Sequence, residues 1–222
     1  MVICDTCNFT YVRIPKNASS SLAHFFVKNY CSQNDKYTEV NDAGIRSHNV
    51  PSSLINKYRE QYRFIHLTMQ ELVDNNIITK DDLLKKENIG VIRNPFERQL
   101  SLFFFLQRQS NDKRPETFRK HFEKGFHYRD MSNHILQTDY LKVDGDDVGT
   151  WWVYENLHQY VQEFAKRKKV KIVTGGLQNF KSNMRPKGEI FDLYYDKKTE
   201  NAVMEYYEQD FIKYNELVGG KK

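Results

Sequence analysis

The chain has few cysteines, few prolines and glycines, and no long hydrophobic run. Only three of its 222 residues are cysteine, five are proline and ten are glycine. This composition excludes a disulfide framework and a low-complexity or collagen-like chain. No apolar run approaches the length that spans a bilayer, and Met1–Asp5 lacks both parts of a secretory signal. We therefore expect a soluble, cytoplasmic protein that is made in a reducing compartment, with no membrane partner.

The cysteines are too few for a typical metal site. Cys4 and Cys7 form a single C-x-x-C pair, and Cys31 is far from it along the chain. A structural zinc site needs four ligands, usually supplied by two such pairs, and the second pair is missing. The sequence therefore favours three ordinary thiols, and we expect no metal.

The mild positive excess of charge suits an anionic ligand. The chain has 34 Lys and Arg against 29 Asp and Glu, and 39% of its residues are apolar. This excess lacks the clustering expected of a dedicated nucleic-acid binder, so no nucleic-acid partner is expected. The apolar fraction excludes disorder, and the sequence contains no internal repeat or flexible linker. We predict a single domain over residues 1–222.

Short apolar runs alternate with amphipathic stretches along the chain. The runs predict strands at 9–14, 63–67, 89–92, 151–154 and 170–173. Predicted helices begin near Ser19, Pro51 and Thr68, at Asn94-Pro95, near Leu157 and at Thr199, which we expect to cap the final helix. This order predicts an α/β, three-layer sandwich with a central, mostly parallel sheet. Residues 107–150 are polar and are expected to form a helical and loop insertion that binds substrate.

The first candidate phosphate site is the stretch from Arg13 to Ser21, which reads R-I-P-K-N-A-S-S-S. It follows a predicted strand and opens a helix, at the sheet edge where α/β proteins bind ligands. Unpaired N–H groups at a helix start suit phosphate, and Lys16 adds a full charge that can reach a bridging oxygen. A serine-capped surface helix with a solvated lysine fits these residues equally well. The stretch is not a Walker A loop.

The second candidate site is the stretch from Arg93 to Ser101, which reads R-N-P-F-E-R-Q-L-S. Arg93 ends the most strongly apolar predicted strand, and Ser101 lies on the same helical face as Asn94 and Arg98. Arg93 and Ser101 are therefore expected to converge on one anion, the arginine as a bidentate donor. For Arg98, a surface ion pair with an acidic neighbour is the alternative.

These two stretches together resemble the sulfotransferase superfamily. Its members carry a P-K-x-x-x-[ST]-[ST] loop and an R-[DN]-P-x-x-R-x-x-S segment, and both patterns occur here in that order. Ile89–Gln107 and the W-V-Y-E-N-L stretch at Trp152–Leu157 are similar to the heparan sulfate 2-O-sulfotransferase branch and its bacterial and viral relatives. The chain departs from the pattern at Asn17–Ser19, where many relatives have a glycine-containing loop, and at Asn94, where aspartate is commoner.

The resemblance implies a P-loop-NTPase-like fold and transfer of a sulfuryl group from 3'-phosphoadenosine 5'-phosphosulfate. The product is adenosine 3',5'-bisphosphate, and the acceptor is a hydroxyl group of a glycan or small molecule. Lys16 would neutralise charge on the bridging oxygen, and Arg93 and Ser101 would bind the 3'-phosphate. The 5'-phosphosulfate would be held by Lys16 together with Asn17, Ala18, Ser19, Ser20 and Ser21.

A general base is also required, because the attacking hydroxyl must lose a proton. His66 is the first candidate, since it ends the predicted strand at 63–67 and should open onto the same sheet edge. Relatives place their proposed histidine between the two phosphate motifs, as here. His48, in the loop before a predicted helix, is the second candidate, and a carboxylate is the third.

A late basic loop at Lys181–Lys187 matches a third donor-binding segment that the resemblance implies, with Arg185 as the donor-binding residue. A solvated charged turn fits this loop equally well. Two other functions are compatible with a nucleotide-binding α/β fold. One is a nucleotide or small-molecule kinase, although the chain has no Walker A loop, and the other is a non-catalytic nucleotide-binding protein. The sequence leaves the acceptor and the oligomeric state open.

Overall fold

The computed structural model describes residues 1–41, 44–59, 63–109, 118–123, 135–171, 177 and 194–220. Residues 172–173 of the predicted strand at 170–173 fall outside these ranges, as do 110–117 and 124–134 of the predicted insertion at 107–150 and the whole Lys181–Lys187 loop with Arg185.

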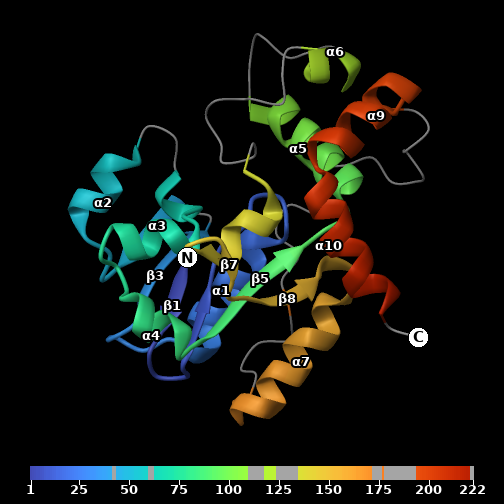
Figure 1. The fold of residues 1–222 in the computed structure, drawn as a ribbon. Coiled ribbons are helices and arrows are strands. Elements are labelled where there is room, and N and C mark those ends of the chain that lie inside the picture. The colour runs from blue at the N-terminus through green and yellow to red at the C-terminus, as the bar shows by residue number, and fades with distance from the viewer. Residues whose placement is uncertain are drawn as a thin grey trace.

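One six-stranded sheet forms the centre of the molecule, with the strand order β4-β3-β1-β2-β5-β8 (Figure 1). Its strands are β1 (Val2–Cys4), β2 (Phe9–Tyr11), β3 (Lys36–Asn41), β4 (Gly44–His48), β5 (Glu87–Ile92) and β8 (Thr150–Val153). The strands β2, β5 and β8 run parallel, whereas β4, β3, β1 and β2 pair antiparallel with their neighbours. The sheet is therefore mixed, and the predicted parallel arrangement applies to one half of it.

The parallel half ends at a common edge. Tyr11 of β2 lies opposite Ile89 of β5, and Ile92, the last residue of β5, lies opposite Val153, the last residue of β8. Each of these strands is followed by a polar corner that leads into a helix. This carboxyl edge is where an open α/β sheet binds its ligands.

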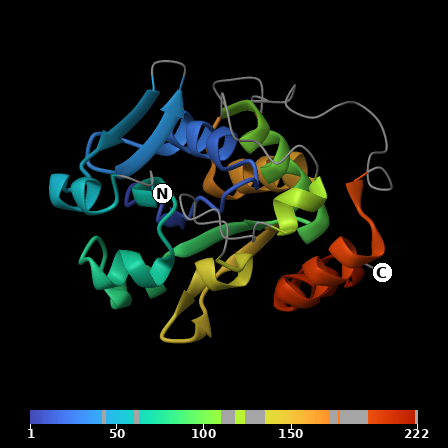
Figure 2. The ribbon, with the colours of Figure 1, turned by 90° about the horizontal axis from the view of Figure 1, so that it is seen from above.

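Helices cover both faces of the sheet, which gives the three layers that the sequence predicts. One face carries α1 (Ser19–Tyr30) and α7 (Leu157–Lys168), and the other carries α3 (Met69–Asp74), α4 (Lys80–Leu84) and the 3-10 helix η4 (Gln137–Leu141). Figure 2 shows the first pair in blue and orange on one side of β5, with η4 in yellow on the other. Strand residues alternate between the two cores, so that Val2 and Cys4 face α1 while Ile3 faces the opposite layer.

The remaining elements extend the molecule beyond the sheet. A short ribbon is formed by β6 (Lys142–Val143) and β7 (Asp146–Asp147), and short helices by α2 (Ser52–Lys57), η2 (Arg63–Ile65) and η5 (Tyr154–Asn156). A separate apolar cluster joins α5 (Pro95–Gln109), α6 (Phe118–Glu123) and α9 (Lys197–Tyr206), and α10 (Glu208–Gly219) follows α9. None of the helices in the described ranges is both long and apolar enough to cross a bilayer.

The helix η4 packs directly on β5 because Gly90 has no side chain. A Cβ atom at Gly90 would lie 2.7 Å from the Cδ1 atom of Leu141, closer than real Cβ contacts allow. This close approach fixes η4, and with it Gln137 at its first position, beside the carboxyl end of β5.

Most predicted helix starts are confirmed. The Asn94 side chain accepts a hydrogen bond from the Phe96 N–H at the start of α5, and Thr68 forms the predicted capping box at the start of α3. Two predictions are wrong. Residues 63–65 form a 3-10 helix rather than a strand, because the chain must turn before the Thr68 cap. The residue that caps α9 is Asp196, with Thr199 as its reciprocal partner, and a second helix, α10, follows.

Candidate functional site

The loop that joins β2 to α1 is strained. Lys16 has φ +68° and Ala18 has φ +56°, both in the left-handed region that residues with a Cβ atom avoid. Each costs about 1–2 kcal/mol, and such conformations persist only where the surroundings enforce them. Contacts from β5, η4 and α5 enforce them here.

The first constraint is the buried side chain of Asn17. It is inaccessible to solvent, and its Nδ2 donates to the carbonyl of Val91 at 2.7 Å and to Oε1 of Gln137 at 2.6 Å. The loop is thus bound to β5 and η4 at once. A buried amide without these partners would cost about 1–3 kcal/mol, so Asn17 holds the loop in one geometry.

Gln137 connects the Lys16 loop to the corner at Arg93. Its Oε1 also accepts the backbone N–H of Arg93 at 2.9 Å, and its Nε2 donates to the Arg93 carbonyl at 3.0 Å. The same Nε2 donates to Asp210 of α10 at 3.2 Å. One fully buried side chain therefore fixes the ends of both corners relative to each other.

A buried ion pair lies behind this connection. Nη1 of Arg98 is 3.9 Å from Oδ2 of Asp210, their side chains are 1% and 0% exposed, and the Nε of Arg98 donates to the Pro15 carbonyl at 3.3 Å. Asp210 also accepts the backbone N–H groups of Gln137 and Thr138. Burial raises the pKa of Asp210, although Arg98 and these donors oppose the shift. The expected surface ion pair of Arg98 is in fact a core pair that supports the Lys16 loop.

Arg93 brings the two predicted phosphate motifs into direct contact. Its Nη1 donates to the carbonyl of Lys16 at 3.2 Å, and its Nη2 lies 3.4 Å from Oε2 of Glu97. The guanidinium centre stacks 4.2 Å above the ring of Tyr154, which follows β8. Arg93 is therefore surrounded by the corners of all three parallel strands.

The start of α1 faces the same edge. Ala18 is its N-cap residue, and no described side chain forms a cap hydrogen bond there. The first N–H groups of a helix have no partner within the helix, so this end retains hydrogen-bond donors and a partial positive charge. Ser19 and Ser20 are half-buried, Ser21 is buried, and the Ser20 hydroxyl accepts a hydrogen bond from Nη2 of Arg13 at 3.2 Å.

Lys16 and His66 interact beside this helix start. Nζ of Lys16 lies 4.0 Å from the centre of the Phe105 ring of α5. His66 is buried, and its Nδ1 is hydrogen-bonded to the Arg13 carbonyl. A carbonyl can only accept, so Nδ1 carries the proton and Nε2 keeps its lone pair. Burial, followed by the charges of Arg13 and then Lys16, holds the pKa of His66 well below its usual value, so the ring is neutral.

The structure does not bring His48 to this edge. His48 ends β4, where it stacks on Tyr37 at 5.0 Å and contacts the Gln33 carbonyl through Nε2 at 2.9 Å. The strands β3 and β1 lie between β4 and β2, so His48 belongs to the opposite end of the sheet. Ser101 lies half-buried on α5, one turn beyond Glu97.

Sequence reasoning missed several residues of the site. Arg13 is fully buried, donates to the Thr38 carbonyl at 2.9 Å, and has a pKa that burial lowers to about 10. Glu39 is buried beside it and pairs with His24 at 3.6 Å and with Arg46 at 3.9 Å. Gln137 and Asp210 were also missed. Arg13 opens the first candidate phosphate stretch, but sequence reasoning assigned it no role of its own.

A separate hollow of about 510 Å³ lies at the other edge of the sheet, between the β1–β2 turn and α4. It is lined by Ile3, Asn8 and Lys36, together with residues of the segment 76–86, and it does not include Lys16, His66 or Arg93. Lys86 and Asp5 in its lining pair at 2.7 Å, and Lys85 and Asp82 pair at 3.6 Å. The chemistry of the site is therefore not located there.

Comparison with known proteins agrees with this geometry. No curated protein and no solved structure matches the chain significantly. The model of the sulfotransferase family matches residues 1–173 of the 222, a span that contains the Lys16 loop, His66, Arg93 and Gln137. The helices α9 and α10, and with them Asp210, lie beyond the matched span. The chain belongs to the sulfotransferase family.

Proposed function

We propose that the protein transfers a sulfuryl group from 3'-phosphoadenosine 5'-phosphosulfate to an acceptor hydroxyl by in-line displacement. The observation that carries this proposal is the contact of the two cationic corners, in which Nη1 of Arg93 reaches the carbonyl of Lys16. This donor carries phosphate groups at the 3' and 5' positions of one ribose. It therefore needs two cationic sites that lie close together. The family membership supports the reaction type.

The 5'-phosphosulfate would bind at the start of α1. Backbone N–H groups and the hydroxyls of Ser19, Ser20 and Ser21 would surround the phosphate, within the partial positive charge of the helix end. Lys16 would donate to the bridging oxygen, on which negative charge grows as the bond to sulfur breaks. The Phe105 ring, 4.0 Å from Nζ, would help to hold the ammonium group in place.

The 3'-phosphate would bind at Arg93 and Ser101. Arg93 is paired in this structure with Glu97, whose side chain is 32% exposed. A phosphate group offers a bidentate partner with a larger charge, so it would replace Glu97 as the counter-ion. Stacking on Tyr154 would hold the guanidinium plane during this exchange. Arg185 stays a predicted third contact to the donor.

His66 would act as the general base. Because Nδ1 is committed to the Arg13 carbonyl, the free lone pair of Nε2 is the one that would accept the proton of the attacking hydroxyl. A ring that stays neutral is ready to accept a proton at physiological pH. The nearby Lys16 raises the cost of charging the ring, so proton transfer would accompany bond formation rather than precede it.

The acceptor is proposed to be a sugar hydroxyl. The basis is the likeness of Ile89–Gln107 and Trp152–Leu157 to the heparan sulfate 2-O-sulfotransferase branch. Trp152–Leu157 contains Tyr154, which stacks on Arg93, so this likeness includes a residue of the site.

The experiment is a transfer assay with sulfur-labelled donor and a panel of glycans, phenols and amines. Replacement of Lys16 by alanine should lower transfer about 100- to 1,000-fold, because one donor to the developing charge is lost. Lys28→Ala, at an exposed position near the other end of α1, is the matched control and should leave transfer unchanged.

Calorimetry separates this proposal from its alternatives. The wild type should bind adenosine 3',5'-bisphosphate more tightly than ATP with magnesium. The reverse order would indicate a kinase and would contradict the proposal. Tight binding of the bisphosphate without transfer to any acceptor would indicate a non-catalytic nucleotide-binding protein.

A further inference from the structure

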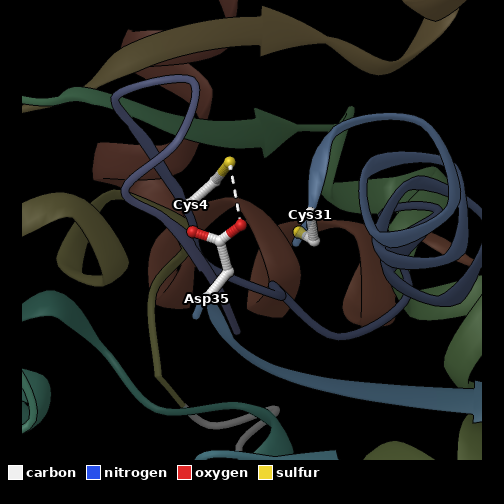
Figure 3. A group of neighbouring side chains, drawn as sticks. All are labelled: Cys4, Cys31 and Asp35. Atoms are coloured by element: carbon white, nitrogen blue, oxygen red, sulfur yellow. Dashed lines mark hydrogen bonds between the residues drawn. The ribbon is translucent and has the colours of Figure 1, made fainter. Parts of the chain in front are cut away.

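The three cysteines, which are separate in the sequence, come together at the amino edge of the parallel strands. Cys4 ends β1, Cys7 lies in the turn before β2, Cys31 follows the last residue of α1, and Asp35 precedes β3. The sulfur atoms of Cys4 and Cys31 and a carboxylate oxygen of Asp35 all lie within 4.8 Å of one another. Figure 3 shows these three side chains converging from three different elements.

Cys7 places a third sulfur next to this group, outside the 4.8 Å that encloses the other three ligand atoms. Its backbone N–H donates to Sγ of Cys4 at 3.3 Å, which closes the C-x-x-C turn. The sulfur atoms of Cys4 and Cys7 lie 3.5 and 3.9 Å from the same carbonyl oxygen, that of Tyr30. The turn therefore presents both sulfurs to the end of α1, where Cys31 is located.

The spacing fits a tetrahedral metal ion. With zinc–sulfur bonds of about 2.3 Å and zinc–oxygen bonds of about 2.1 Å, a sulfur and an oxygen ligand lie about 3.6 Å apart. Sγ of Cys4 is 3.7 Å from Oδ2 of Asp35. Cys4 and Asp35 are fully buried, whereas Cys7 and Cys31 are half-buried, which leaves a route for an ion to enter.

Backbone N–H groups orient the carboxylate of Asp35 beside the sulfur atoms. The N–H groups of Ser32 and Asp5 donate to Asp35 at 2.6 Å each, so its carboxylate is ionised and oriented. Anionic sulfur and oxygen atoms in such proximity repel each other unless protons or a cation lie between them.

We propose that Cys4, Cys7, Cys31 and Asp35 bind one zinc ion. Three thiolates with one carboxylate favour zinc over magnesium or calcium, which prefer oxygen ligands. Binding would release the three thiol protons to solvent, with no change in oxidation state. The ion would tie the β1–β2 turn to the end of α1. Because α1 has 12 residues, the ion would lie about 18 Å along the helix from the Lys16 loop, too far to take part in the transfer reaction.

Metal analysis of the full chain tests this proposal. Protein expressed with added zinc should hold about one ion per chain after exhaustive dialysis, as in other structural sites. Cobalt, used in place of zinc, should give sulfur-to-metal charge-transfer absorption together with intense visible bands of a tetrahedral complex. Chelation of the zinc should lower the unfolding temperature of the wild type.

Single substitutions test the contribution of individual ligands to metal binding. Cys31→Ser should lose the cobalt charge-transfer intensity of one sulfur, and Asp35→Asn should weaken zinc binding at least about 10-fold. Asp82→Asn removes an exposed carboxylate that pairs with Lys85 and should bind zinc as the wild type does. If a cysteine variant does not fold, the cobalt spectrum of the wild type still decides the question.

Two outcomes would overturn the proposal. One is a chain that takes up neither zinc nor cobalt and has the same unfolding temperature with and without chelator. The other is an intact mass lower by two hydrogen atoms, which would reveal a disulfide between two of the three cysteines. Neither outcome affects the proposed transfer reaction, because donor binding is measured separately and depends on the other end of α1.

Discussion

The two ends of α1 are stabilised in opposite ways. Its first turn follows two residues in left-handed conformations, has no described side-chain cap, and is held from outside by β5, η4 and α5. Its last turn leads into a segment that satisfies itself locally. There the carboxylate of Asp35 accepts the N–H groups of Asp5, Thr6 and Ser32, and the cysteine sulfurs pack against the Tyr30 carbonyl.

This difference indicates which end binds ligand and which end maintains the fold. Strain and unpaired donors cost free energy, and they are retained where a ligand will use them. Dense local hydrogen bonding, such as that around Asp35, is typical of a structural element. Changes at the first end should therefore reduce activity more than stability, and changes at the last end should do the reverse.

The largest expected effect is at His66. Asparagine can keep the hydrogen bond from the Nδ1 position to the Arg13 carbonyl, but it has no basic lone pair in place of Nε2. We expect His66→Asn to lower kcat about 100- to 10,000-fold with little change in donor affinity, because only proton removal is lost. Steady-state kinetics and calorimetry measure the two quantities.

His48→Asn is the matched control for this prediction and should keep full activity, since His48 contacts Gln33 at the other end of the sheet.

The pH dependence gives a second check. The pKa of His66 lies well below 6.5, so the acidic limb of kcat/KM should fall below that pH as well. The unfolded chain binds a proton near pH 6.5, whereas the buried ring does not, so stability should decrease as the pH drops below this value. His66→Asn should remove this loss of stability at low pH. If the acidic limb of kcat/KM is unchanged in His66→Asn, His66 is not the general base.

The sequence predicts the parts of the fold that local signals specify. Buried runs such as Ile89–Ile92, and helix starts such as Asn94-Pro95 and Thr68, depend on neighbours in the chain. The antiparallel half was not predicted. The strand β1 has only three residues, and β3 alternates charged and apolar residues in K-Y-T-E-V-N, so neither gives a strong periodic signal.

For the site, the sequence identified the charged groups but not what positions them. Lys16, Arg93 and His66 are at the carboxyl edge, as predicted, although His66 follows a 3-10 turn rather than a strand. The amide contact between Asn17 and Gln137 joins residues 120 positions apart, and no spacing rule could indicate it. Likewise, Cys31 approaches Cys4 only because α1 returns the chain to the edge where β1 ends.

The second largest effect is expected at Asp210, which supports the first end of α1 from a helix beyond the matched family span. Asp210→Asn keeps the shape of the side chain but leaves the 1% exposed Arg98 without its counter-ion. We expect the free energy of unfolding to fall by about 3–5 kcal/mol, the usual consequence of an uncompensated buried charge. Urea denaturation measures this loss.

Asp139→Asn is the control for Asp210→Asn. Asp139 lies on η4, which Asp210 contacts from α10, but it forms an exposed pair with Lys142 at 2.8 Å. Its loss should cost at most about 1 kcal/mol. A similar small loss for Asp210→Asn would show that the α10 carboxylate is dispensable.

The smallest effect is expected at Ala18, and it has the opposite sign. Glycine relieves about 1–2 kcal/mol of left-handed strain at φ +56°, while the greater freedom of the unfolded chain offsets about 0.4–1 kcal/mol of this gain. Ala18→Gly should therefore raise the free energy of unfolding slightly. Ala202→Gly, inside α9, should lower it by about 1 kcal/mol, because the backbone there is ordinary helix. If both variants lose stability equally in urea denaturation, Ala18 is not strained, and Lys16 is left as the strained residue at this end of α1.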